Sequence, residues 1–333
     1  MGAARFGPVR LARGVAMAAA ALLLLLLLVL AGFRLAAALR EDGAPAPPGT
    51  RMVPTPYGAV AVTVSGPASG RPVMLVHGTA AWGGFWKDVA EHLARRGWRV
   101  VAVDLPPFGW SEHDALARYD RITQAERLAA VLASTAGQPA VVVGHSFGAG
   151  PATELALRHG RRLRSLVLVD AALGELDSES GGDGGVLRFR PLAEAATSAT
   201  ITNPAAIGPL LRSMIERKAR AAKWLPVLKA PMRRRGTTSA YAAWLPDLFA
   251  ATDRALSRRS ANLKRLAMPL ALIWGEADTV TPIGQGVRIA ALGRARSFAT
   301  LPGVGHIPHI EDPKAFLAAL DAAIAPDRGG AGK

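Results

Sequence analysis

The sequence predicts an α/β protein: a mostly parallel, doubly wound sheet with a helical insertion and one N-terminal helix long enough to cross a membrane. Short apolar runs rich in Val, Ile and Leu alternate with amphipathic helical patterns, the order that builds a parallel sheet. This alternation stops over 171–260 and then resumes. A long uncharged segment precedes the first strand pattern. Half of the 333 residues are hydrophobic, which excludes general disorder.

The first element is the uncharged segment 15–33, which contains seven consecutive leucines. A helix of this length spans about 28 Å, close to the thickness of the hydrocarbon core of a bilayer. We therefore expect residues 1–40 to form a retained, single-pass membrane anchor. A cleaved signal peptide is the alternative, because Ala36, Ala37 and Ala38 offer a small-residue cleavage site.

Basic residues flank both ends of this segment, so the positive-inside rule leaves its orientation open. They are Arg5, Arg10 and Arg13 before it, and Arg34, Arg40 and Arg51 after it. The abundance of Ala and Arg favours a bacterial source. We expect a protein of the bacterial inner membrane with a periplasmic body, or a secreted protein if the segment is cleaved.

Residues 41–56 hold five prolines and are expected to form an extended, semi-rigid linker. The body divides into a core, 57–170 and 261–325, and a helical cap, 171–260. Core strands are predicted at 59–64, 73–78, 99–105, 140–144, 165–170, 270–275 and 297–301, and core helices near 85–96, 121–136, 148–159, 284–292 and 313–324. The strands lack polar alternation, so helices should cover both faces of the sheet. Such sheets bind ligands at the carboxyl ends of their strands.

Composition excludes several classes of function. The chain has no cysteine, which rules out disulfides, thiol chemistry and thiolate metal sites. The histidines are scattered and no glycine-rich nucleotide motif follows the first strand, so we expect neither a metal nor a cofactor. The net charge of +15 is concentrated in 1–40 and 171–260 without any nucleic-acid-binding motif. We therefore expect no nucleic-acid partner and a body held near anionic lipid.

The predicted cap contains a basic stretch, 212–235, with nine basic residues and one acidic residue among apolar ones. Two interpretations stay open: the stretch lies on anionic lipid, or it is a solvated basic helix face. A second stretch carries Trp244, Leu248 and Phe249, which line an acyl pocket or only pack the cap on the core. Trp82, after the second predicted strand, is a further candidate for the pocket.

Residues 144–148 form a G-x-S-x-G pattern, Gly-His-Ser-Phe-Gly, between a predicted strand and a predicted helix. A strand that turns into a helix so abruptly leaves no room for a Cβ at the flanking glycines and exposes Ser146 at the helix N-terminus. A serine hydroxyl needs a nearby base to act as a nucleophile. The alternative is a serine that only caps the helix.

A base and an acid follow in the order that this chemistry requires. Asp278 lies in the loop after the 270–275 strand, and His306 lies just after the last strand. In a parallel sheet both loops open at the same edge as Ser146. Asp170, at the end of the 165–170 strand, is the alternative acid, and we favour Asp278.

Together with HGTAAW from His77, DLPPFGWSE from Asp104, GEADTVTP and GHIPHIEDP, these motifs resemble the α/β-hydrolase superfamily. The likeness is to its serine-nucleophile type with a helical cap and covers about 57–325. It implies Ser146 as nucleophile, His306 as general base and then acid, and Asp278 as the carboxylate that orients the imidazole. It also implies an oxyanion hole made by the backbone N–H groups of Phe147 and Thr79.

The remaining histidines are given other roles. We expect His77 and His145 to be hydrogen-bonded structural residues, and His309 to be exposed to solvent.

The sequence therefore predicts a serine hydrolase that cleaves carboxylic esters of a small, apolar or lipid-derived molecule, such as a monoacylglycerol, through an acyl-Ser146 intermediate. Hydrolysis of carbon–carbon bonds or amides, and perhydrolysis, use the same three residues and stay open. A receptor that keeps the fold without the chemistry is a further alternative. The oligomeric state is left open.

Overall fold

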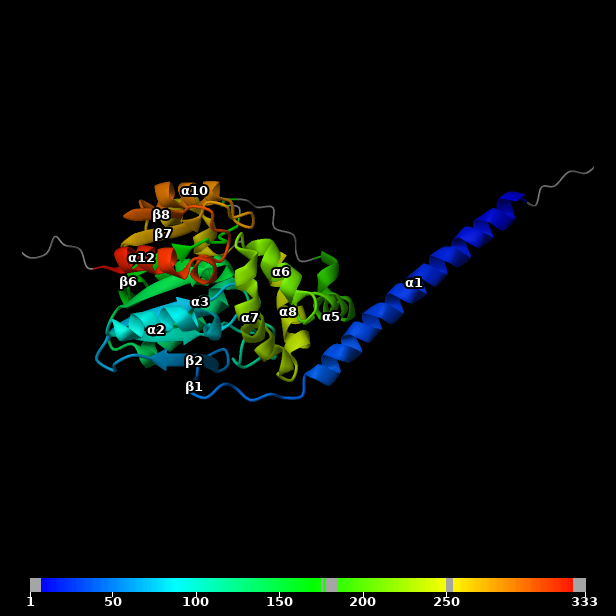
Figure 1. The fold of residues 1–333 in the computed structure, drawn as a ribbon, viewed down its shortest axis with the longest axis horizontal. Helices are drawn as coiled ribbons and strands as arrows, with labels where there is room; N and C mark the ends of the chain where they lie inside the picture. The colour runs from blue at the N-terminus through cyan, green and yellow to red at the C-terminus, as the bar shows by residue number, and fades with distance from the viewer. Residues whose placement is uncertain (1–6, 175, 178–184, 250–253, 326–333) are drawn as a thin grey trace, which may run out of the picture.

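The computed structural model describes residues 7–174, 176–177, 185–249 and 254–325. Within them, one sheet of eight strands has the order β1-β2-β4-β3-β5-β6-β7-β8. From β4 to β8 in this order the strands run parallel, and β2 pairs antiparallel with both β1 and β4. The predicted fold class is confirmed: a mostly parallel sheet, a helical insertion and a long apolar N-terminal helix (Figure 1).

The strands are β1 (Thr50–Val53), β2 (Val60–Ser65), β3 (Arg71–Val76), β4 (Trp98–Val103), β5 (Ala140–His145), β6 (Leu163–Val169), β7 (Leu270–Gly275) and β8 (Ser297–Leu301). Most residues of β3 to β7 are buried, as expected for strands covered on both faces. The register brings Val76 level with Val103 and Gly144. The carboxyl ends of these strands therefore form one edge, from which the functional loops leave.

Helices cover both faces of the sheet. On one face lie α2 (Lys87–Arg95) and α12 (Pro313–Ile324), and on the other lie α3 (Arg121–Thr135), α4 (Ala149–Arg158) and α10 (Ile283–Gly293). Neighbouring strand residues point to opposite faces. In β3, Leu75 packs in the cluster with α2 and α12, whereas Met74 packs in the cluster with α3 and α4. These five helices lie within a few residues of their predicted positions.

The proline-rich segment 41–56, which we expected to be an extended, semi-rigid linker, joins the sheet with part of its length. Thr50–Val53 pairs antiparallel with β2 as an edge strand, and Val53 is buried. Pro48 and Pro54 stand just outside this strand, where their missing N–H groups remove no hydrogen bond from the ladder. The chain is therefore bound to the core from residue 50 onward.

The helical insertion between β6 and β7, which we call the cap, shows no strand among its described residues. It contains α5 (Arg190–Ala199), α6 (Ile207–Met214), α7 (Ala221–Lys229) and α8 (Thr237–Phe249), and the short α9 (Ser260–Leu263) leads back to β7. Leu211 and Trp224 of the cap share an apolar cluster with Phe85 and Ile307 of the core. The cap thus covers the carboxyl edge of the sheet (Figure 1).

Basic residues of the 212–235 stretch attach the cap to the rest of the protein. Arg217 pairs with Asp312 at 2.8 Å between Nη1 and Oδ2, and Lys223 and Arg233 pair with Asp88 and Asp42. These ion pairs give part of the stretch a structural role. That the stretch also touches lipid stays a prediction.

Helix α1 (Gly7–Arg40) extends away from the body (Figure 1). Within the described residues, Ala12–Arg40 is the one segment long and apolar enough to cross a membrane, with a mean hydropathy of 2.8 over its most apolar window. This criterion rests on length and composition, and a signal sequence would also satisfy it. The last turns of α1 pack against α5, and Ala37 is completely buried.

Candidate active site

The G-x-S-x-G pattern forms a sharp turn between β5 and α4. Ser146 has a φ of +50°, a left-handed conformation that a residue with a side chain adopts only when its surroundings enforce it. A Cβ on Gly144 would approach the Ala149 Cα to 2.9 Å, and one on Gly148 would collide with the carbonyl oxygen of His77. Glycine is therefore required on both sides of the serine for reasons of space.

The three predicted residues Ser146, His306 and Asp278 meet at the carboxyl edge of the sheet. The Ser146 Oγ donates to the His306 Nε2 at 2.8 Å, and the His306 Nδ1 donates to the Asp278 Oδ2 at 2.8 Å. All three side chains are buried. Asp278 follows β7, His306 follows β8 and Ser146 follows β5, so parallel strands that end together bring distant residues into one chain of hydrogen bonds.

Asp278 is held as a carboxylate. Its Oδ1 accepts from the backbone N–H groups of Val280 and Thr281, and its Oδ2 accepts from the Thr281 hydroxyl at 2.6 Å. Burial alone would raise the pKa of this group, but the hydrogen bond and charge of His306, with the bonds from Thr281, lower it to about 2. An ionised Asp278 fixes the proton on the His306 Nδ1 and leaves the Nε2 free to accept from the serine.

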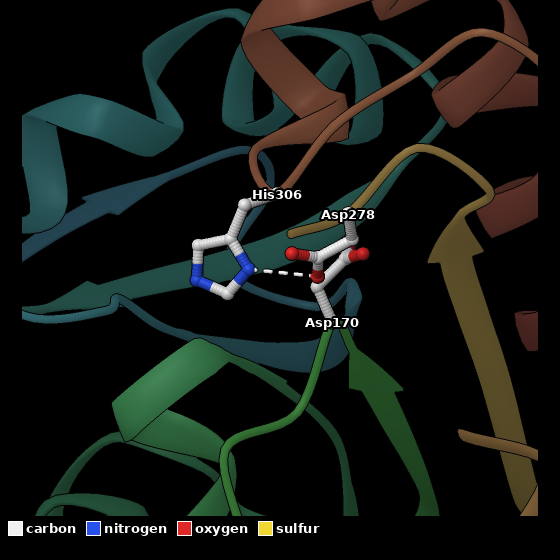
Figure 2. Close-up of side chains that lie close together, drawn as sticks. All are labelled: Asp170, Asp278 and His306. Atoms are coloured by element: carbon white, nitrogen blue, oxygen red, sulfur yellow. Dashed lines mark hydrogen bonds and ion pairs between the residues drawn. The ribbon is translucent and has the colours of Figure 1, made fainter. Parts of the chain in front are cut away.

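Asp170, the alternative acid, lies beside Asp278 but does not bond with the histidine. Figure 2 shows the two carboxyl groups next to each other, with the dashed bond running from His306 to Asp278. The Asp170 Oδ1 accepts from the Gly275 N–H at 2.8 Å. Burial, with the negative charge of Asp278 close by, raises the pKa of Asp170 well above its ordinary value. Of the two carboxyl groups, Asp170 is therefore the one that holds its proton to the higher pH.

The side chains of Asp170, Asp278 and His306 place possible ligand atoms within 4.8 Å of one another, a spacing that a metal ion could use. The His306 Nδ1 and the Asp278 Oδ2, however, already share a proton at hydrogen-bonding distance. The raised pKa of Asp170 also disfavours metal binding, since metals bind deprotonated oxygen. This cluster suits a hydrogen-bonded relay to Ser146.

The loop after β3 lies against the serine. A Cβ on Gly78 would meet the Ser146 Cβ at 3.0 Å, so the backbone passes close to the nucleophile candidate. Thr79 and Phe147 both line the cavity that Ser146 and His306 also line. Their N–H groups stay our candidates for the oxyanion hole.

Ser146 and His306 open into a cavity of about 670 Å³ between the core and the cap. Most of its lining is apolar and comes from Ala80, Ala81, Phe85, Phe147, Ile201, Ile207, Leu210, Leu211, Met214, Leu228, Leu248, Val280 and Ile307. A cavity of this size and character suits a small apolar molecule or one acyl chain. Arg121 and Asp247 are among the polar side chains at its wall.

The four predicted pocket residues lie at different places. Leu248 lines the cavity. Trp244 is completely buried behind Phe147, with ring centroids 5.5 Å apart, and Trp82 donates from its Nε1 to the Val227 carbonyl of α7 at 2.7 Å. Neither tryptophan is among the lining residues. The side chain of Phe249 lies outside the described part of the structure.

Sequence reasoning missed the contribution of α6 to the cavity. Ile207, Leu211 and Met214 recur at helical spacing and all line it. Their periodicity identifies the buried side of this helix, but only the folded cap shows that the buried side faces Ser146. The carbonyl oxygen of Met214 also accepts from the His306 N–H at 2.8 Å, which joins α6 to the loop of the base.

The other histidines of the motif loops have structural surroundings. The His77 Nε2 accepts from the Leu105 N–H, and the His145 Nε2 donates to the His306 carbonyl, both at 2.8 Å. Burial lowers the pKa of His77 to about 4 and that of His145 to about 3. Both rings are therefore neutral at physiological pH, as structural residues should be.

The expectation that His309 is exposed to solvent was wrong. Its side chain is buried and stacks on Trp86, with ring centroids 4.2 Å apart. Burial lowers the pKa of His309 well below its ordinary value. The short helix α11 (Pro308–Glu311) turns this residue inward, toward Trp86 and Phe316.

Residues 73–320 match the model of the alpha/beta hydrolase family. The chain belongs to this family. The match covers the described sheet from β3 onward, the cap and all three members of the hydrogen-bonded trio.

Relatives of this hydrolase differ in the reactions for which they are named. A pimeloyl-[acyl-carrier protein] methyl ester esterase of Chromobacterium violaceum is 30% identical over 258 residues, which are 75% of this chain and 93% of the esterase. A 2-hydroxymuconate semialdehyde hydrolase of Pseudomonas sp. (strain CF600) is 40% identical over 108 residues, which are 31% of this chain and 38% of that protein.

A solved structure resembles the hydrolase over nearly its whole length. The crystal structure of a membrane phospholipase A, a bacterial virulence factor, has a TM-score of 0.63, 22% identity, and coverage of 95% of this chain and 96% of that one. At this identity the likeness shows the fold alone. The family and the triad-like arrangement together identify a serine hydrolase, whose homologues include lipases, esterases and carbon–carbon bond hydrolases.

Proposed function

We propose that this hydrolase is a membrane-anchored esterase that cleaves apolar or lipid-derived carboxylic esters through an acyl-Ser146 intermediate. The observation that carries the proposal is the position of the Ser146–His306 pair in the wall of a mostly apolar cavity. Such a lining favours an acyl chain over a charged substrate. The whole-length relative named as a methyl ester esterase supports ester chemistry.

The geometry supports the following steps. The His306 Nε2 takes the proton of Ser146 as its Oγ attacks the ester carbonyl carbon, and the Asp278 carboxylate stabilises the imidazolium that forms. The N–H groups of Thr79 and Phe147 stabilise the negative oxygen of the tetrahedral intermediate. His306 then protonates the leaving alcohol, and water hydrolyses the acyl-serine by the same route in reverse.

The anchor is part of the proposal. Ala37 lies in the middle of the small-residue site at which a signal peptide would be cut, yet it is buried and α1 packs on the cap there. Cleavage at a buried helical site would first require local unfolding. This supports a retained α1 in a bacterial inner membrane, with the body on the periplasmic side as our expectation.

The test is hydrolysis of p-nitrophenyl esters with acyl chains from acetyl to palmitoyl by the full chain in detergent. We expect activity that rises with chain length until the cavity is filled. Ser146→Ala should abolish it and should also abolish labelling by a fluorophosphonate, whereas Ser69→Ala, an exposed serine far from the site, should retain both. Labelling lost only in Ser146→Ala excludes a receptor without chemistry.

Carbon–carbon bond hydrolysis is the second candidate, because one relative, named as a 2-hydroxymuconate semialdehyde hydrolase, shares 40% identity over 108 residues. The same three residues could serve that reaction. A dienoic ring-fission product offered beside the ester series separates the two. Turnover of the dienoate with no ester hydrolysis would replace our proposal by this one.

A further inference from the structure

The C-terminal part of α1 is bound to the cap at two levels. The Arg34 Nε donates to the Glu194 Oε2 of α5 at 3.0 Å, and the Arg40 Nη2 donates to the Thr202 carbonyl at 2.6 Å. Between these levels Ala37 is buried. The Glu41 carboxylate then accepts from the backbone N–H of Thr238 at 2.8 Å, at the start of α8. The end of the apolar helix is therefore fixed relative to the cap.

These two bonds also fix the direction of α5 relative to α1. From Arg34 to Arg40 the chain of α1 advances in the same sense as the chain from Glu194 to Thr202. The two helices thus run in the same sense and pack against each other. Moving backward along α5 from Glu194 means moving toward the uncharged segment 15–33.

This alignment of α5 with α1 places the residues just before α5 level with the uncharged segment of α1. Phe189 precedes Glu194 by five residues, or about 7 Å of helix, which is the level of roughly residue 29 on α1. Val186 lies in the single turn before it, Gly185–Arg188. Both side chains are strongly exposed, Val186 at 68% and Phe189 at 64%. Single exposed apolar residues are ordinary, but these two lie at the start of α5, which packs on α1, and α1 has the composition of a membrane span.

The same turn touches the wall of the cavity. Leu187, between the two exposed residues, packs on the apolar cluster of Phe108, Tyr241 and Trp244, where Phe147 and Ile201 also pack. Phe147 and Ile201 line the cavity. Ile201 is also the neighbour of Thr202, which accepts the bond from Arg40. The short segment 185–189 therefore lies between the apolar helix α1 and the cavity that we propose for the acyl chain.

We propose that the cap edge formed by Val186 and Phe189 is immersed in the lipid bilayer beside α1, and that the ester substrate reaches the cavity from the bilayer past this edge. The partner is a lipid surface, and the immersed groups are two apolar side chains. Arg190, which follows them, has a half-exposed side chain whose Nη2 lies 3.5 Å from the Glu194 Oε1, and long basic side chains of this kind can extend toward the headgroups. The second half of this proposal rests on the proposed esterase function; the first half does not.

The absence of cysteine allows a direct test of immersion. The full chain carrying Phe189→Cys, labelled with an environment-sensitive fluorophore, is placed in vesicles of phosphatidylcholine and phosphatidylglycerol that contain a doxyl-lipid quencher. Leu24→Cys, inside α1, is the positive control, and Val287→Cys, 55% exposed on α10 of the core, is the negative control. We expect strong quenching at positions 24 and 189 and none at 287. Equal fluorescence at 189 and 287 would show that the edge lies in water.

The route of the substrate is tested by the double variant Val186→Ser with Phe189→Ser. Hydrolysis of a long-chain ester dissolved in the vesicles should fall at least about threefold, because less apolar surface is buried in the bilayer. Hydrolysis of a short, water-soluble ester should not change. An equal loss on both esters would assign the edge a structural role and overturn the route. If the unmodified chain hydrolyses neither ester, the proposed function fails, whereas the quenching result still decides immersion.

Discussion

The base of the active site holds two buried carboxyl groups that differ in their partners. Asp278 accepts from His306 and Thr281, whereas Asp170 accepts from the Gly275 N–H. Like charges this close do not both ionise. The hydrogen-bond partners therefore decide which of the two groups is the carboxylate. The order of Asp170 and Asp278 along the chain does not reveal this.

Substituting each carboxyl group by its amide should separate their roles. In Asp278→Asn the His306 Nδ1 loses its acceptor and the imidazole takes the wrong tautomer, so we expect kcat to fall by about 10⁴. In Asp170→Asn the bond between His306 and Asp278 is retained, and kcat should fall less than about tenfold. Steady-state kinetics of the two purified variants give the comparison, and a reversed order would assign the catalytic carboxylate to Asp170.

Asp170 should also make stability depend on pH. Its folded pKa is raised above the ordinary value of 3.8, so between 3.8 and the raised value the folded chain keeps a proton that the unfolded chain releases. The stabilisation from this group is complete below pH 3.8 and is lost as the pH rises, at about 1.4 kcal/mol per pH unit.

Asp170→Asn removes that slope. We measure the free energy of unfolding of both proteins in detergent with urea from pH 4 to 7. As the pH rises, the value for the variant minus the value for the unmodified chain should increase. A constant difference across this range would mean that Asp170 titrates normally.

At the scale of single elements, the turn from β5 to α4 requires a glycine at position 148 for reasons of space and not of backbone angle. Gly148 has a φ of −63°, which any residue can adopt. Its constraint is the His77 carbonyl oxygen, which a Cβ would strike. This close approach lets the β3 loop, with Thr79 of the cavity wall, pass beside Ser146.

Gly148→Ala should therefore destabilise the fold by about 1–3 kcal/mol, as overpacking does. It should also lower kcat, because the β3 loop must shift. Gly137→Ala is the matched control, since a Cβ there meets nothing within 4 Å. Urea unfolding and ester hydrolysis of both variants test this. Equal stability of the two proteins would contradict the packing at Gly148.

Elements with a long, regular pattern of apolar residues could be predicted from the sequence. Features that depend on contacts with distant parts of the chain could not. The parallel strands and core helices were predicted because each has a long apolar pattern, and the trio at 146, 278 and 306 because three motifs follow three strands. Strand β1 was missed because four residues between prolines show no pattern of their own. His309 was misjudged because its burial depends on Trp86, which lies more than 200 residues earlier.

At the scale of the whole molecule, α1, the cap and the core form one connected series. Ala37 of α1 is completely buried at the first connection, so a larger side chain there should overpack the contact with the cap. We expect Ala37→Leu to weaken the packing of α1 on the cap by about 1–3 kcal/mol.

The exposed neighbour Ala38 provides the control, because Ala38→Leu adds the same atoms on the open side of the helix. The melting temperature of the full chain in detergent should fall for Ala37→Leu and stay within error for Ala38→Leu. Equal melting temperatures would show that α1 does not pack on the body in solution.

The bond from the His306 N–H to the Met214 carbonyl places a limit on motion during turnover. If α6 swung outward like a hinged lid, it would pull away the main-chain partner of the proton-transferring residue and disturb its alignment with the serine. Helix α6 must then stay in place in the cavity wall while substrate enters and product leaves. For the esterase that we propose, release of a long acyl product through such a fixed passage, rather than bond cleavage, should then limit the rate of turnover.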